Sequence, residues 1–301
     1  MDIKGRIIFF FKPMSLRVGL FVNKEKRGAL ELLLELLEYF KKHHVSFFLE
    51  ETTARLVGLK GISLNLLPRE VDLILAAGGD GTIIRIAHEI FPSPVPILGV
   101  NTGSLGFLTA VSRDEIIPEL PKILEGHFRK SSRMVLKAVG SAYGKDFEIP
   151  CSLNDIVLFR GSFSHMTTID VFAQGKLVTE YQSDGLVIAT PTGSTAYALS
   201  TGGPIVVPES KVFTLNPICP HTLTNRSLVF AEEVVLRFSI PLGGGPVRLE
   251  YDGVAHGDLH PGDWLQVEAR PESVVLGFLE ERDFFEILRK KLRWSGAAVE
   301  D

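Results

Sequence analysis

Cysteine, long apolar runs and blocks of like charge are all scarce in this sequence. The 301 residues include two cysteines, Cys151 and Cys219, without C-x-x-C spacing, and two thiols cannot make a zinc site by themselves. Both lie in apolar surroundings, so we expect buried thiols in a reducing compartment. The longest apolar run near the N-terminus, IIFFF at 7–11, is too short for a signal-peptide core or a membrane span. We therefore expect a cytoplasmic protein without a membrane partner.

The charge balance also argues against a nucleic-acid partner. The formal net charge is -4, and no run of Lys and Arg is long enough to form a nucleic-acid track. A small anionic ligand is still compatible with this composition, because binding one requires local donors rather than a global positive charge.

The length favours two domains. Up to residue 130, strand-like stretches (16–23, 45–50, 71–77 and 96–101) alternate with helix-like ones (27–44 and 82–91). This alternation indicates a Rossmann-like parallel α/β domain. A further helical stretch at 113–126 carries prolines, which we expect to break it. Residues 1–13 fit no clear element, so we expect Met14 to be the physiological start, which mass spectrometry of the native N-terminus tests.

After Arg133 the pattern changes to short alternating strands separated by turn sequences such as GGG at 243–245. This spacing is typical of a β-sandwich. The helical, basic stretch at 283–294 is expected to pack back on the first domain. The expected division is an α/β domain over 1–130, joined by the returning segment 281–301, and a β-sandwich domain over 131–280.

One glycine-rich turn, AAGGDGT at 76–82, follows an apolar strand and opens a helix. Backbone N–H groups of such a turn bind phosphate, but the sequence has neither the lysine of a P-loop nor the third glycine of a dinucleotide fingerprint. Asp80 is the informative residue. A carboxylate beside phosphate is repulsive unless a cation bridges them or unless it takes a proton from an attacking hydroxyl, and both occur in phosphoryl transfer. The alternative that Asp80 caps the helix stays open from spacing alone.

Three other segments are rich in polar ligand-binding groups. The stretch SDGLVIATPTGSTAYALSTGGP at 183–204 has no Lys or Arg, which suits a base or ribose, although a loop of Ser/Thr turns is the alternative. Asn154 and Asp155 stand together at a strand start, where they either grip ribose hydroxyls or cap a turn. Asp252 and Gly253 predict a type I′ hairpin turn.

Together these motifs resemble those of the NAD kinase family. Its patterns G-G-D-G-T, N-[ED] and D-G-x-x-x-x-T-P-T-G-S-T-A-Y stand here, in that order, at 78–82, at 154–155 and from Asp184 to residue 197. The stretch 216–230 is also similar, and the resemblance covers roughly residues 16–280. The first motif is shared with diacylglycerol, sphingosine and phosphofructokinase-type kinases, whereas the second is specific.

The resemblance implies phosphorylation of the adenosine 2′-hydroxyl of NAD to give NADP, with ATP or polyphosphate as donor. Asp80 would be the general base, or would orient the hydroxyl and a Mg²⁺ ion carried mainly by the nucleotide, and no protein metal ligand is assigned. Nucleotide-binding roles are implied for Gly78, Gly79, Gly81, Thr82, Arg85, Asn154, Asp155, His165, Asp184, Thr195, Ala196, Tyr197, Ser200 and, more weakly, Asp252. A homodimer or homotetramer with shared sites is also implied.

Three residues depart from the family's usual pattern. Asp155 replaces the more usual Glu, Gln182 stands where many bacterial relatives have Arg, and Val254 stands where Gln is often found. The departures at Gln182 and Val254 are expected to affect substrate affinity more than the phosphoryl-transfer step.

Two alternative functions are another kinase of the same superfamily and a sensor that binds NAD or NADP without turnover. The specific second motif argues against another kinase of the superfamily. The carboxylate kept at Asp80 argues against a sensor, because binding alone does not need a base.

Overall fold

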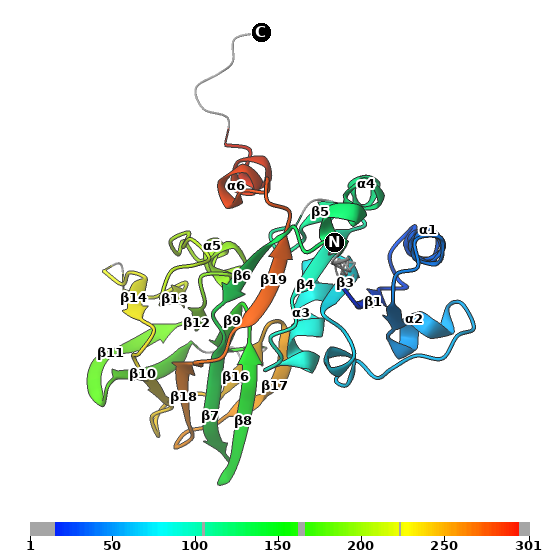
Figure 1. Ribbon diagram of the computed structural model, residues 1–301. Helices are drawn as coiled ribbons and strands as arrows, with labels where there is room; N and C mark the ends of the chain where they lie inside the picture. The colour runs from blue at the N-terminus through cyan, green and yellow to red at the C-terminus, as the bar shows by residue number, and fades with distance from the viewer. Residues whose placement is uncertain (1–15, 104–105, 162–165, 223, 295–301) are drawn as a thin grey trace, which may run out of the picture.

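The computed structural model describes residues 16–103, 106–161, 166–222 and 224–294. These residues form a layered α/β unit and an antiparallel β-sandwich (Figure 1). The expected Met14 start and His165 lie outside the described residues.

The first sheet is mostly parallel. Its strands are β1 (Val18–Val22), β2 (Phe47–Leu49), β3 (Leu73–Gly78), β4 (Ile97–Asn101), β5 (Val111–Ser112), β6 (Arg129–Arg133) and β19 (Val274–Phe278). Their order is β2-β1-β3-β4-β19-β6, with β5 paired to β4, and β6 is the antiparallel member. Every residue of β1, β3 and β4 is buried, as expected for a parallel sheet covered on its faces.

The order of the strands reverses between β1 and β3. From β1 the chain passes through α1 (Ala29–Lys42) to β2 on one side, and from β3 through α3 (Asp80–Ile90) to β4 on the other. Because parallel crossovers are right-handed, α1 and α3 cover opposite faces of the sheet. The carboxyl ends of β1 and β3 therefore border a crevice, the usual ligand position in such sheets.

The remaining helices of the first unit are short or carry proline. They are α2 (Glu51–Arg55), η1 (Leu67–Arg69) and α4 (Arg113–Leu124). The expectation that prolines break the 113–126 helix is wrong, since α4 runs through Pro118 and Pro121. A capping box between Ser112 and Glu115 starts it, and a buried apolar face holds it against the sheet. In α1 the predicted apolar face is confirmed, with Leu32, Leu33, Leu36, Leu37 and Phe40 buried.

The second unit consists of two six-stranded antiparallel sheets. One has the order β11-β10-β15-β18-β7-β8, from β7 (Leu136–Ala142), β8 (Lys145–Ser152), β10 (Thr167–Ala173), β11 (Lys176–Ser183), β15 (Leu236–Ser239) and β18 (Trp264–Ala269). The other has the order β14-β13-β12-β9-β16-β17, from β9 (Asp155–Phe159), β12 (Gly185–Ala189), β13 (Val212–Ile218), β14 (Leu228–Ala231), β16 (Val247–Tyr251) and β17 (Val254–Leu259). Inward-facing side chains of both sheets share one core, which confirms the predicted sandwich. Two short helical turns, η2 (Gly193–Thr195) and α5 (Tyr197–Ser200), lie between β12 and β13.

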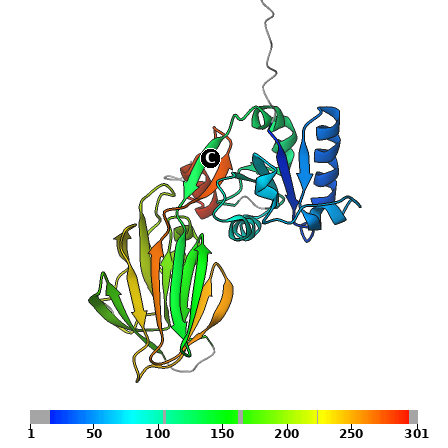
Figure 2. The same cartoon turned by 60° about the horizontal axis from the view of Figure 1, so that its bottom comes forward.

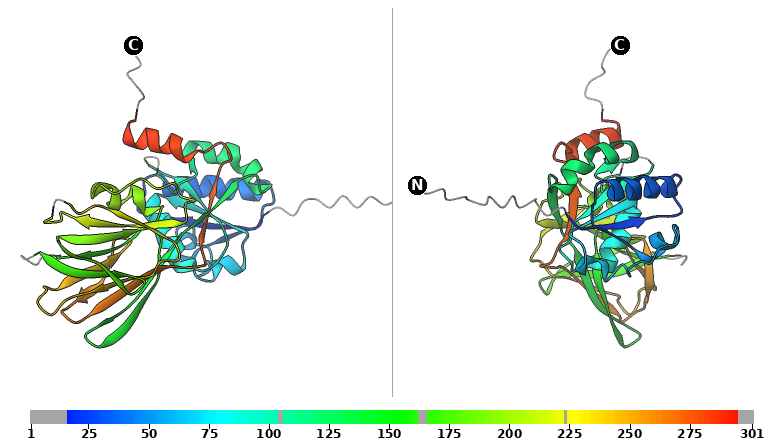
Figure 3. Two further views of the ribbon diagram at one scale, coloured as in Figure 1. Left: turned by 90° about the vertical axis from the view of Figure 1, so that its left-hand side faces the viewer. Right: turned by 45° about the vertical axis from the view of Figure 1, so that its right-hand side comes forward.

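The chain crosses between the two units twice, through β6 and β19 (Figure 2). Both strands belong to the first sheet, so we draw the sandwich inside the expected limits of 131 and 280, from Leu136 to Ala269. After β19, α6 (Phe284–Leu292) returns to the first unit beside α4 (Figure 3). The ring of Phe284 lies 6.3 Å from that of Phe107, which confirms the predicted return of the C-terminal helix.

Two expectations drawn from composition have different outcomes. Cys151 is buried, but Cys219 is exposed, so the expectation of two buried thiols is wrong for the second. Cys219 follows the last residue of β13 and takes a left-handed backbone conformation (φ 43°), which carries it out of the sheet. No helix among the described residues is both long and apolar enough to cross a membrane.

Candidate functional site

The glycine turn lies in the crevice at the carboxyl ends of the strands. A cavity of about 180 Å³ opens there, between the ends of β3 and β4 and the loop that follows β1. Its lining residues are Lys26, Gly78, Gly79, Asp80, Asn101, Thr102, Gly103, Gly106 and Lys291. The buried hydroxyl of Thr102 has no hydrogen-bond partner among the described residues. The cavity thus has polar groups on several sides.

The glycines of the turn serve two different purposes. A side chain at Gly78 would overlap that of Thr82, so Gly78 allows the strand to pass close to α3. Gly79 and Gly81 have open space where a side chain would be, so their backbone is accessible to a ligand. Thr82 is buried and its hydroxyl accepts a hydrogen bond from Asn23 at 3.2 Å. The Thr82 side chain therefore ties two strand ends together and does not line the cavity.

Asp80 does not cap the helix. The N-cap of α3 is Gly79, and Asp80 is the first helical residue. Its carboxylate instead accepts hydrogen bonds from the backbone amides of Phe107 (2.9 Å) and Leu108 (3.0 Å). A carboxylate has about four acceptor positions, so two amides leave it able to accept another proton. The open alternative of a helix cap is therefore wrong.

Gly106 packs directly against this carboxylate, since a side chain there would overlap it. Lys26, from the loop after β1, and Lys291, near the end of α6, add two cations to a cavity that otherwise holds one carboxylate. Sequence reasoning missed both lysines. The position of Lys26 after the first strand was a usable signal, but nothing near Lys291 in the sequence connects it with residues 78–82.

The second motif folds against the Asn154–Asp155 pair. The amide of Thr190 donates to the carbonyl of Asn154 (2.9 Å), and its hydroxyl donates to the carbonyl of Leu153 (2.6 Å). A side chain at Gly193 would overlap the backbone of Asn154, so glycine permits this approach. The two motifs, separated by thirty-odd residues, therefore form one surface.

Asp155 is 5% exposed at the start of β9. Burial first, and then the nearby carboxylate of Asp252, raise the pKa of its carboxyl to about 7, against a backbone hydrogen bond from Tyr197 that lowers it. Near neutral pH this group therefore exists as both carboxyl and carboxylate, able either to donate to or to accept from a ribose hydroxyl.

The hydroxyls of the 183–204 segment are largely used within it. Thr190 accepts from the amide of Gly193 (3.1 Å), and Ser194 donates to the carbonyl of Pro191 (2.6 Å). These hydrogen bonds form Ser/Thr turns, as the alternative interpretation of this segment as a loop of such turns predicted. Tyr197 and Ser200 are exposed, and Thr195 and Ala196 are partly buried beside them, so this group is accessible to a ligand.

Asp184 makes a 2.8 Å ion pair with Arg160, a residue that sequence reasoning missed. The signal lay in strand pairing, because β9 and β12 are antiparallel neighbours and their ends bring residues 160 and 184 together. Arg85 is exposed and lies 5.5 Å from the ring of Phe21, and it does not line the cavity at Asp80. A phosphate role for Arg85 stays a prediction.

The predicted type I′ turn at Asp252 is confirmed. Asp252 and Gly253 both have positive φ (46° and 76°) and join the paired residues Tyr251 and Val254. The Asp252 side chain, however, points inward and binds the backbone of the Asn154–Asp155 loop and His88 of α3. Sequence reasoning missed His88.

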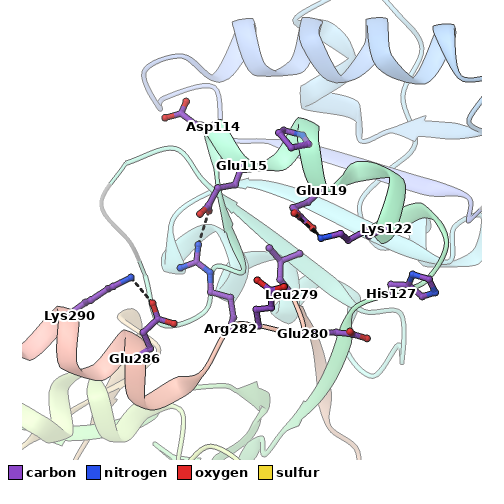
Figure 4. Close-up of a pocket in the computed structure, with 12 residues that line it drawn as sticks. Asp114, Glu115, Glu119, Lys122, His127, Leu279, Glu280, Arg282, Glu286 and Lys290 are labelled. Atoms are coloured by element: carbon purple, nitrogen blue, oxygen red, sulfur yellow. Dashed lines mark hydrogen bonds and ion pairs between the residues drawn. The ribbon is translucent and has the colours of Figure 1, made fainter.

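A larger cavity, about 630 Å³, lies elsewhere, between α4 and the segment leading into α6 (Figure 4). Six carboxylates line it against three Lys and Arg side chains. Several pair internally, as Arg282 does with Glu115 at 2.8 Å. A groove of this charge repels the phosphates of a nucleotide, so size alone does not identify the nucleotide site.

A doubly wound sheet with a small polar cavity at its switch point, followed by a sandwich with an accessible hydroxyl-rich turn, defines a two-domain nucleotide-binding protein. Residues 18–128 match the family described as "ATP-NAD kinase N-terminal domain", and residues 153–276 match "ATP-NAD kinase C-terminal domain". The chain belongs to the NAD kinase family.

Individual relatives agree with this assignment. An NAD kinase of Chlorobium limicola is 36% identical over 280 residues, 93% of this chain and 96% of that protein. One of Moorella thermoacetica is 37% identical over 288 residues, 95% of this chain and 92% of that protein. Among solved structures, an Archaeoglobus fulgidus NAD kinase in complex with ATP is 25% identical with a TM-score of 0.71, covering 93% of this chain and 100% of that one. A yeast NADH kinase complexed with NADH shares the fold at 24% identity, with a TM-score of 0.84 over 97% of this chain and 91% of that one.

Proposed function

We propose that this chain transfers a phosphoryl group from ATP, or from polyphosphate, to the 2′-hydroxyl of the adenosine ribose of NAD, giving NADP. The observation that carries the proposal is the Asp80 carboxylate, held by two backbone amides in a cavity whose neighbouring glycines leave open backbone. Asp80 accepts the hydroxyl proton as the ribose oxygen bonds to the γ-phosphorus. The bond from that phosphorus to the bridging oxygen breaks, and ADP leaves when ATP is the donor.

The cavity supplies charge for the donor's phosphates. The amino end of α3 carries partial positive charge, and Lys26 and Lys291 stand on two other sides. These groups offset the negative charge of a triphosphate beside Asp80. Gly79 and Gly81 let the phosphate oxygens approach the backbone closely.

A Mg²⁺ ion fits this site only as part of the nucleotide. Among the described residues, no three or more acidic, His or Cys side chains are arranged so that they could hold a metal ion. The cavity does provide two hard oxygen groups, the Asp80 carboxylate and the unpartnered hydroxyl of Thr102. When bound, the ion would neutralise developing charge on the phosphoryl group, with the phosphates supplying most of its ligands.

The sandwich half of the site holds the acceptor. Asn154 and Asp155 grip the hydroxyls of a ribose, and Asp184, Thr195, Ala196, Tyr197 and Ser200 line the adenine and the nicotinamide ribose. The accessible turn at Tyr197 and Ser200, whose segment is hydrogen-bonded to the loop of Asn154 and Asp155, supports this assignment.

We also propose a cytoplasmic homodimer or homotetramer in which a neighbouring subunit completes the nucleotide site. The exposed ring of Tyr197 (44% exposed) and other uncovered apolar side chains of the sandwich, such as Leu177, are compatible with such contacts. Sedimentation of the purified protein with and without NAD measures the assembly.

The reaction itself is tested by incubating the purified protein with NAD, ATP and Mg²⁺ and detecting NADP with an NADP-specific dehydrogenase. The wild type is expected to make NADP, and Asp80→Asn to turn over about 10²-fold more slowly with little change in NAD affinity, since the loss of a general base acts on the chemical step. Near-wild-type turnover of Asp80→Asn would contradict the base assignment. NAD binding without product from ATP or polyphosphate would instead favour a sensor.

A further inference from the structure

Asp252 has a side chain that is 0% exposed, and its carboxylate accepts five hydrogen bonds. Oδ1 accepts from the Ser152 hydroxyl (2.9 Å) and from the amides of Asn154 (2.7 Å) and Asp155 (2.9 Å). Oδ2 accepts from the amide of Leu153 (2.6 Å) and from Nε2 of His88 (2.6 Å). A group so enclosed does not touch a nucleotide, so any effect it has on the reaction passes through the groups that it binds.

The first of these groups is the loop that carries the acceptor-binding pair. Three consecutive amides, those of Leu153, Asn154 and Asp155, converge on one carboxylate. The amide of Asp252 in turn donates to the carbonyl of Asp155 (2.9 Å). A buried carboxylate is tolerated only when its hydrogen bonds are satisfied. The loop and the hairpin turn therefore hold each other in one conformation.

The second group is the helix that carries Asp80. His88 lies eight residues after Asp80 on α3, just over two helical turns. Because the carboxylate only accepts, the imidazole donates from Nε2, and its ring also packs 5.5 Å from that of Tyr251. One carboxylate thus joins α3 of the first unit to the Asn154–Asp155 loop of the second.

We propose that Asp252 and His88 form a positioning pair that fixes the Asp80 turn relative to the loop that grips the acceptor ribose. This inference rests on the proposed phosphoryl transfer. A reaction between a base on one unit and a hydroxyl held by the other depends steeply on their separation, and a misplacement near 1 Å costs about 10²-fold in rate. The hydrogen bond from His88 is a direct side-chain link between the two and helps to set this separation.

Two substitutions of His88 separate the link from simple packing. His88→Leu removes the donor, whereas His88→Gln places an amide N–H near the position of Nε2 and restores it. We expect His88→Leu to lower kcat about tenfold or more with the KM for NAD changed less than about twofold, because the loop stays bound to Asp252. His88→Gln is expected to recover most of kcat. Glu89→Gln, an exposed neighbour on the same helix, is the matched control.

Asp252→Asn is expected to lower kcat and also to raise the KM for NAD, because it places an N–H₂ group among donors. The double variant with His88→Leu should lose less than the product of the two single effects. All variants are compared at matched folded fraction by circular dichroism. Any of three results would contradict the proposed positioning pair. These are a folded His88→Leu with wild-type kcat, a His88→Gln as slow as His88→Leu, or a change confined to the KM for NAD. A wild type that makes no NADP overturns the proposed function itself, which separates the two failures.

Discussion

Replacing Asp155 by asparagine perturbs the most strongly shifted carboxyl near the candidate site. Its pKa is raised from 3.8 to about 7 by burial and by the Asp252 carboxylate. A group whose folded-state pKa is raised binds its proton more tightly in the folded protein than in the unfolded chain. Folding is therefore progressively disfavoured as the pH rises from the unfolded pKa to the folded one, and the full cost is present above about pH 7.

The magnitude follows from the size of the shift. About three pKa units at 1.36 kcal/mol each give a cost of at most about 4 kcal/mol above pH 7. Between pH 5 and pH 8 the cost grows by roughly 2–3 kcal/mol. Asparagine keeps an oxygen for the amide of Tyr197 and carries no charge, so Asp155→Asn should be more stable than the wild type by an amount that increases over this range.

Urea unfolding of both proteins at pH 5, 6, 7 and 8 measures this difference, and other titrating groups cancel in the comparison. NAD affinity is measured in parallel and is expected to fall, because the amide replaces a group proposed to grip ribose. A stability difference that stays constant with pH, or that shrinks as the pH rises, would refute the reasoning. Glu250→Gln, a partly buried acid on neighbouring β16, serves as the control for removing one charge nearby.

Two further predictions concern adjacent or chemically matched residues. Lys291 lines the cavity at Asp80, whereas Lys290 pairs with Glu286 on another side of α6. Lys291→Gln should therefore raise the KM for ATP about tenfold, the worth of one charge-assisted contact, and Lys290→Gln should not; equal effects would contradict the placement. Burial raises the pKa of the Cys151 thiol to about 12, while Cys219 is exposed. A maleimide is expected to label the native protein once, at Cys219, and labelling that persists in Cys219→Ser would contradict this difference.

The elements of the first unit could be predicted from the sequence because their patterns are local. The apolar face of α1 repeats with the helical period, and β3 is a continuous apolar run that ends at the glycine turn. The wrong prediction at α4 also came from a local pattern. Pro118 and Pro121 disfavour a helix in the sequence, but the apolar face of α4 that stabilises the helix is buried only in the folded protein.

The motifs at 78–82, 154–155 and 190–197 could also be recognised in the sequence, since each depends on residue types at fixed spacing. The sequence alone did not decide whether Asp80 caps its helix. That depended on the amides of Phe107 and Leu108, which bind the carboxylate from more than twenty residues away.

What only the tertiary structure decided is which distant residues complete the site. Lys291 reaches the cavity because the last helix folds back across the first unit, and Arg160 meets Asp184 through strand pairing. Asp252 and His88, 164 residues apart, meet at 2.6 Å because a hairpin turn of the sandwich lies against α3. The sequence by itself determined most of the helices and strands and the residue types of the motifs, since these follow from local periodicity and spacing. The pairings across the fold depend on packing between elements far apart in the chain, which no local pattern encodes.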